Sequence, residues 1–125
     1  MTDLGPSAIP ELTARIAPGW STELEVGPGW FELLTRLNRD LAAIAPGYVI
    51  EQCKSKFGGL RFYARASDDD LNPFEFDERI RDAEAESEAI CEECGRPAAP
   101  ITVRGWVWTL CNRHAAQRGP DSAAS

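Results

Sequence analysis

Residues 91–114 read CEECGRPAAPITVRGWVWTLCNRH, and this stretch decides how the C-terminal part of the chain folds. A C-x2-C pair at Cys91 and Cys94 is followed, after sixteen residues, by a C-x2-H pair at Cys111 and His114. Zinc is held tetrahedrally by thiolate and imidazole groups, and pairs with this short spacing can each come from one tight turn. The spacing therefore predicts one structural Zn²⁺ per chain, with four protein ligands.

The segment between the two pairs predicts a small β-hairpin followed by a helix. Residues 101–103 and 106–110 are rich in β-forming side chains, and Arg104 with Gly105 suits a tight turn between them. The second ligand pair then enters a short helix that we expect to end near Gly119. A ligand knuckle, a hairpin and a helix in this order are typical of a treble-clef or zinc-ribbon-like finger.

A disulfide between Cys91 and Cys94 is the alternative interpretation. It would leave Cys111 and His114 unexplained, and acidic neighbours such as Glu92 raise rather than lower the pKa of a thiol. A catalytic zinc keeps one position open for water, whereas four protein ligands close the site. Because His114 is also the only histidine in the chain, we expect a protein that is not an enzyme.

Two further residue types in this region have a structural and a functional interpretation. Trp106 and Trp108 alternate on one strand and point to the same side, where we expect them to pack over the metal or against the rest of the protein. A partner surface is the alternative. The fourth cysteine, Cys53, lies outside the two pairs and is expected to be a buried apolar side chain.

Upstream of the finger the sequence predicts an α+β body in which helices pack on a small antiparallel sheet. Apolar residues recur at helical spacing from Trp30 to Ile44, and a second helix is expected from about Phe74 or Asp77 to Ile90. Between the helices, two β-rich runs, 48–53 and 60–66, bracket a glycine turn. In the hairpin formed by these runs, Leu60, Phe62 and Ala64 share one face, while Arg61, Tyr63 and Arg65 share the other.

These predictions divide the chain into a body, a finger and a tail. Residues 1–90 form the body, and its residues 1–27 are expected to be irregular apart from one short helix near Pro10. Residues 91–118 form the finger, packed on the body, and the polar residues 119–125 are expected to be a disordered tail.

Composition restricts the classes of partner. The chain has 125 residues, 43% of them hydrophobic and 26% charged, which is typical of one folded globular domain. Its net charge of −7 opposes broad attachment to nucleic acid or to an anionic membrane. Acidic residues occur where a secretory or mitochondrial presequence would carry basic ones, so we expect a cytoplasmic protein with no membrane partner.

An acidic stretch suggests a protein partner. Between Asp68 and Glu93 there are twelve acidic residues, against Arg79 and Arg81. A solvated helix face is the plain interpretation, and a surface that meets a basic partner, as in an inhibitor or immunity-type protein, is the functional one. The residues expected to make this surface are Asp68, Asp69, Asp70, Glu84, Glu86 and Glu88.

A basic and aromatic hairpin suggests a second class of function. Cations for phosphates and flat rings for bases are what a surface for nucleic acid needs, although core packing of the aromatic residues with ordinary exposed lysines is the plain alternative. The alternative is therefore a nucleic-acid-binding accessory or regulatory protein that uses the basic hairpin together with Arg104, Arg113 and Arg118 of the finger. Its hairpin face consists of Lys54, Lys56, Arg61, Tyr63 and Arg65.

Three motifs together carry a resemblance. They are KFGGLRFY at 56–63, CEECG at 91–95 and GWVWTLCNRH at 105–114. With them the chain resembles small, largely uncharacterised bacterial and phage proteins that share such a string followed by a C-x2-C-G knuckle and a Trp-containing cysteine–histidine ending. The resemblance covers the middle and C-terminal two-thirds of the chain and implies a zinc-binding accessory protein.

Overall fold

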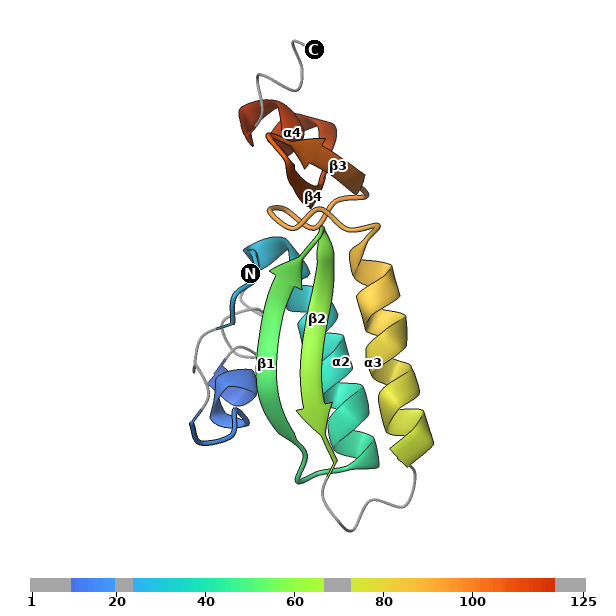
Figure 1. Ribbon diagram of the computed structural model, residues 1–125. Helices are drawn as coiled ribbons and strands as arrows, with labels where there is room; N and C mark the ends of the chain where they lie inside the picture. The colour runs from blue at the N-terminus through green and yellow to red at the C-terminus, as the bar shows by residue number, and fades with distance from the viewer. Residues whose placement is uncertain (1–9, 20–23, 67–72, 119–125) are drawn as a thin grey trace.

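The computed structural model describes residues 10–19, 24–66 and 73–118 and confirms the α+β class. Helices α2 and α3 lie together on one face of the β1–β2 hairpin, and the second hairpin with helix α4 lies beyond the turn end of the first (Figure 1). The elements in chain order are η1 (Pro28–Trp30), α2 (Phe31–Ile44), β1 (Val49–Lys56), β2 (Gly59–Arg65), α3 (Pro73–Ser87), β3 (Ala99–Val103), β4 (Trp106–Leu110) and α4 (Asn112–Arg118).

Helix α2 supplies the central apolar stripe of the core. Pro28 opens a short 3-10 turn, so Trp30, which was expected to begin the helix, precedes it and is completely buried. At the other end the N–H of Ala45 bonds to the carbonyl of Leu41 just before Pro46, which cannot continue a helix. The buried residues of α2 are Leu33, Leu34, Leu37, Asn38 and Leu41.

The β1–β2 hairpin is longer and tighter than predicted. Its turn consists of two residues, Phe57 and Gly58, with φ of 56° and 80°, which is the backbone that a type I′ turn requires. Gly59, expected in the turn, is instead the first residue of β2. Leu60 and Phe62 are buried on the face toward the helices, whereas Tyr63 is exposed on the other face, as the alternation predicts.

Helix α3 closes the core beside β2. Phe76, Ile80 and Ala83 are buried, and the ring of Phe76 meets that of Tyr48 edge-on with 5.6 Å between centroids. The helix ends at Ser87, earlier than the predicted Ile90, and turns with hydrogen bonds to residues three positions back carry the chain to the finger. Within the described residues, no helix combines the length and the apolar character needed to cross a membrane.

The described part of the N-terminal segment docks on β1. Residues 10–14 are helical and bury Leu12 completely, in agreement with the predicted short helix. Ala17 then donates to the carbonyl of Ile50, and Ile50 donates to that of Arg15, at 2.7 and 2.8 Å. This pairing covers part of the β1 edge that β2 leaves free.

Candidate metal centre

Four side chains from the two ends of the finger converge on one point. The ligand atoms of Cys91, Cys94, Cys111 and His114 all lie within 4.8 Å of one another. The sulfurs of Cys94 and Cys111 are 3.8 Å apart, and Nδ1 of His114 lies 3.7 Å from the sulfur of Cys91 and 3.3 Å from that of Cys111. This cluster could hold one metal ion.

Local backbone geometry places each pair. Around the first pair, Gly95 donates to the carbonyl of Cys91 and Cys91 donates to that of Arg96, so the chain turns back on itself. Gly95 has φ of 84°, which favours glycine there. The second pair is set by α4, because Cys111 directly precedes the helix and His114 lies in its first turn.

Between the pairs, β3 and β4 form an antiparallel hairpin whose turn residues Arg104 and Gly105 have φ of 53° and 86°. The order knuckle, hairpin and helix is consistent with the predicted treble-clef or zinc-ribbon-like finger. The finger therefore has the local turns that its sequence predicts.

The electrostatics of the cluster favour thiolates at two positions. Burial opposes ionisation of Cys91, but hydrogen bonds from backbone groups outweigh it and lower the pKa of this thiol. A backbone hydrogen bond from His114 lowers the pKa of Cys111. Thiolate is the form in which cysteine binds metal.

The finger is joined to the body mainly through Glu92, which is buried. One carboxylate oxygen accepts from the backbone N–H of Gly27 at 3.1 Å and the other accepts from the hydroxyl of Ser55 at 3.1 Å. Both oxygens of a buried carboxylate thus have donors, which offsets the cost of its burial. In addition, Gly29 donates to the backbone carbonyl of Glu92 at 2.7 Å.

A second contact joins the finger to the turn of the β1–β2 hairpin. The hydroxyl of the buried Thr109 donates to the carbonyl of Gly58. A Cβ at Gly58 would lie 2.9 Å from a methyl carbon of Val107, so this position needs glycine for its close approach as well as for its turn. The first glycine of the KFGG string is therefore explained in part by the finger, whereas a Cβ at the second, Gly59, would lie 3.0 Å from a carboxylate oxygen of Glu88 in the body.

The metal cluster is buried on one side and open on the other. Cys91 is completely buried, whereas Cys94 is exposed and His114 is half-buried. A cavity of about 480 Å³ opens beside the exposed ligands and has Arg96 and Arg113 in its lining. A chelator in solution can therefore approach the site.

The structure places the predicted acidic surface differently from the expectation. Asp68, Asp69 and Asp70 lie outside the described residues. The carboxylate of Glu84 accepts from the backbone N–H of Phe62 at 3.0 Å, and Glu86 forms an ion pair with Arg36 at 2.8 Å. Only Glu88 of the described members is exposed without such a bond. Glu84 and Glu86 therefore have partners within the chain, because α3 lies directly beside β2 and α2.

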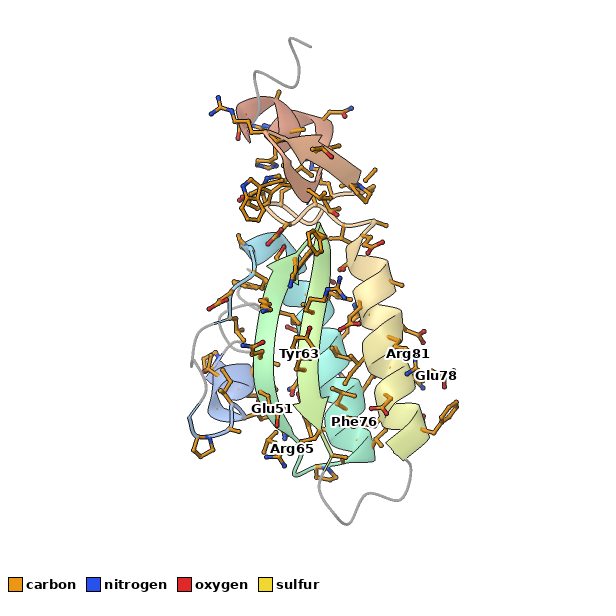
Figure 2. All side chains as sticks on the ribbon, in the orientation of Figure 1. Glu51, Tyr63, Arg65, Phe76, Glu78 and Arg81 are labelled. Carbon is orange, nitrogen blue, oxygen red and sulfur yellow. The ribbon has the colours of Figure 1, made fainter. Side chains whose placement is uncertain are left out.

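The predicted basic face is assembled on one side of the β1–β2 hairpin. Lys54 lies directly opposite Arg61 in the register, and Tyr63 lies opposite Gln52. Lys56 is exposed, with its ammonium 5.5 Å from the centre of the Phe57 ring. Arg65 is the exception, since it forms an ion pair with Glu51 at 2.8 Å. Figure 2 shows Tyr63, Arg65 and Glu51 along the hairpin.

The packing expected of both tryptophans is wrong for Trp106, whose side chain is 68% exposed. Trp106 is the first residue of β4, next to the turn, at the end of the strand that is farther in sequence from Cys111. Trp108, two residues closer to the ligands, is half-buried. Cys53 agrees with its expected role, because it is buried and burial raises the pKa of its thiol to about 12.

Sequence reasoning missed the residues that dock the finger. Glu92 and Glu93 were interpreted only by their charge, although Glu92 is the buried link to the body. A Cβ at Gly29 would lie 2.1 Å from the carbonyl oxygen of Cys91, and the indole N–H of the buried Trp30 donates to the carbonyl of Ile90 at 2.9 Å. The Gly-Pro-Gly-Trp run at 27–30 is the signal that could have indicated a close backbone contact.

Comparison with models of protein families, with curated proteins and with solved structures finds no match to this chain. The resemblance to small bacterial and phage proteins therefore stays a prediction.

Proposed function

We propose that this protein binds one zinc ion through Cys91, Cys94, Cys111 and His114 and that the ion has a structural role. Soft thiolate ligands with an imidazole select zinc among the common divalent ions, whereas calcium and magnesium prefer oxygen ligands. Four protein ligands complete a tetrahedron and leave no position for a reacting water. We therefore propose that the protein acts by binding and has no catalytic activity.

The distances within the cluster carry this proposal. Zn–S bonds of about 2.3 Å and Zn–N bonds of about 2.0 Å place two sulfurs about 3.8 Å apart and a sulfur and a nitrogen about 3.5 Å apart in a tetrahedron. The sulfurs of Cys94 and Cys111 are 3.8 Å apart, and the two sulfur–nitrogen distances are 3.3 and 3.7 Å. Three of the six distances between ligand atoms thus match a tetrahedral zinc site, and all four ligand atoms lie within 4.8 Å of one another.

The positions of the four ligands in the chain support a structural role for the ion. Cys91 and Cys94 lie on either side of Glu92, whose carboxylate accepts hydrogen bonds from the body. Cys111 and His114 lie at the start of α4. The apolar core of the chain includes helices α2 and α3 and the β1–β2 hairpin, but none of its buried members comes from the finger. Small modules with little core of their own depend on such a metal for folding.

Metal analysis of freshly purified protein tests the proposal. We expect one zinc per chain, lost on chelation and in each of the variants Cys91→Ser, Cys94→Ser, Cys111→Ser and His114→Ala. Cys53→Ser is the matched control and should keep its zinc, because Cys53 lies in the core of the body. Retention of metal in His114→Ala together with its loss in Cys53→Ser would show that the ligand set is wrong.

We further propose that the protein acts by contact with a macromolecule. An inhibitor or immunity-type contact with a basic protein would use exposed acidic residues of α3. Because Glu84 and Glu86 have internal partners, the surface shifts to Asp77, Glu78 and Asp82 of α3 and to Glu88 just beyond its end. Figure 2 shows Glu78 beside Arg81 on the outer side of α3, so this surface is of mixed charge.

Charge reversal tests that contact. A variant with Glu78→Lys and Asp82→Lys should associate more slowly with a basic partner captured from the native host, and the salt dependence of association should fall. Unchanged association rates would contradict a role for α3. The zinc content, measured in the same variant, keeps this result separate from the proposal on the metal.

A further inference from the structure

Among the residues that the structure describes, no helix packs on one face of the β1–β2 hairpin. Helices α2 and α3 cover the face that carries Leu60 and Phe62, and the opposite face is turned away from them (Figure 1). We call this opposite face the hairpin outer face. It consists of Gln52, Lys54, Lys56, Arg61 and Tyr63, with Phe57 at the turn.

The hairpin outer face holds positive charges that the described chain does not neutralise with ion pairs. Lys54 and Arg61 are directly opposite in the register, where Cβ atoms lie about 5 Å apart, and like charges at such positions destabilise a sheet. Within the described residues neither side chain forms an ion pair or a hydrogen bond. The backbone of Glu25 bonds to Cys53 and Ser55 on either side of Lys54, and within the described residues no ion pair joins Glu25 to Lys54. The Lys54–Arg61 pair therefore lowers the stability of the hairpin, and both side chains are available to bind an anion.

Exposed aromatic rings accompany these charges. Tyr63 is 46% exposed and lies two residues from Arg61 on the same face. Phe57 is 63% exposed at the turn, next to Lys56. Exposed rings beside cations provide flat faces on which bases can stack, next to charges that can contact phosphates.

We infer that the hairpin outer face binds single-stranded nucleic acid. Lys54, Lys56 and Arg61 contact phosphates, and bases stack on Tyr63 and Phe57. The face spans about 14 Å from Gln52 to Lys56 at roughly 3.4 Å per residue, which suits a short stretch of strand. This inference goes beyond the proposed zinc role, because every residue in it belongs to the body.

A flexible single strand fits the charge distribution better than a duplex. The chain carries a net charge of −7, so a long rigid polyanion would meet repulsion beyond this face. Repulsion between exposed charges falls off over about 10 Å at 0.1 M salt, so a short strand confined to the hairpin avoids most of it. Single-strand surfaces also combine cations with stacking rings and need no groove-reading helix.

Fluorescence anisotropy with a labelled pyrimidine oligonucleotide tests the inference on the full, zinc-loaded chain. We expect binding at low salt that weakens as salt rises, with a log–log slope near −2 for three phosphate contacts at about −0.7 each. Tyr63→Ala should weaken binding roughly 5- to 150-fold, the effect of losing one stacked base. Lys54→Ala combined with Arg61→Ala should reduce the slope by about 1.4.

Matched variants separate this face from general charge effects. Arg81→Ala removes one cation from the exposed side of α3 and should leave binding unchanged. Zinc content and circular dichroism of each variant exclude unfolding as the cause. No binding at low salt would overturn the inference, and so would equal affinity of Tyr63→Ala and the unmodified chain. Binding of a basic protein that blocks the α3 surface, with no oligonucleotide affinity, would assign the function to α3 instead.

Discussion

The carboxylate of Glu84 on α3 accepts a hydrogen bond from the backbone N–H of Phe62 on β2, over 3.0 Å. Three residues further along the helix, the hydroxyl of Ser87 accepts from the N–H of Leu60 at 2.9 Å. Both N–H groups belong to the β2 edge that does not pair with β1. An edge with free donors is a template for pairing with another chain. Side chains of α3 satisfy these donors, so α3 protects the edge as well as covering the core.

Replacing Glu84 should therefore destabilise the body. Glu84→Ala leaves the part-buried N–H of Phe62 without an acceptor, at a cost of about 1–3 kcal/mol. Glu84→Gln keeps an oxygen acceptor and should cost less. Urea unfolding followed by circular dichroism measures both changes. Glu78→Ala on the exposed side of the same helix is the control, and equal losses for it and Glu84→Ala would contradict the role of this bond.

Replacing Glu92 should release the finger from the body. Glu92→Ala removes the acceptor for both the N–H of Gly27 and the hydroxyl of Ser55, at about 1–3 kcal/mol for each group left unsatisfied. Hydrogen exchange should then speed up at residues 27–30 and in the finger while the metal stays bound. Glu78→Ala on the exposed side of α3 is the control. Loss of zinc from Glu92→Ala at full occupancy in the control would show that docking and metal binding are inseparable.

Gly29 should tolerate no side chain. Gly29→Ala would place a Cβ 2.1 Å from the carbonyl oxygen of Cys91 and 2.6 Å from the nitrogen of Gly95, and backbone atoms cannot move aside cheaply. We expect a loss of at least the roughly 1–3 kcal/mol typical of overpacking. Gly105→Ala is the comparison, because its φ of 86° gives a strain of about 1 kcal/mol with nothing within 4 Å of the new atom. Thermal unfolding that ranks Gly105→Ala as the more harmful change would contradict the close approach.

Ionisation of the Cys53 thiol in the unfolded chain should lower the free energy of unfolding at alkaline pH. Burial, and to a lesser extent the carboxylate of Glu25, raise the pKa of its thiol from 9.0 to about 12. Below pH 9.0 the thiol is neutral in the folded and the unfolded chain, so its contribution is fully present. Between pH 9.0 and about 12 only the unfolded chain loses the proton, and stability falls by about 1.4 kcal/mol per pH unit.

Urea unfolding across this pH range, compared between the unmodified chain and Cys53→Ala, measures the effect. The alanine variant should show a shallower decline, because it has no thiol to titrate. Parallel declines would mean that Cys53 ionises normally in the folded state. Slow modification of Cys53 by a thiol reagent in the folded, zinc-loaded chain is the corresponding kinetic expectation.

Structural features that depend on residues close together in the sequence could be predicted from the sequence alone. The helical spacing from Trp30 to Ile44 predicts α2, and the alternation from Leu60 to Arg65 predicts which side chains of β2 face the core. The spacing of the two ligand pairs predicts which side chains converge at the metal cluster. These features depend on a few consecutive residues and on the fixed periods of helices and strands, so they leave a local signature.

Contacts between distant segments were decided by the tertiary structure. Glu84 and Glu92 both belong to the acidic stretch between Asp68 and Glu93 that was interpreted by its charge, yet one bonds to the edge of β2 and the other is buried between the finger and the body. Nothing near them in the sequence marks the N–H groups of Phe62 and Gly27 as their partners. A backbone donor has the same chemistry at every position, so only packing of the elements determines which donors remain to be satisfied. The sequence by itself therefore determined most of the elements and the members of the cysteine–histidine cluster, while the fold alone decided how α3 and the finger attach to the hairpin.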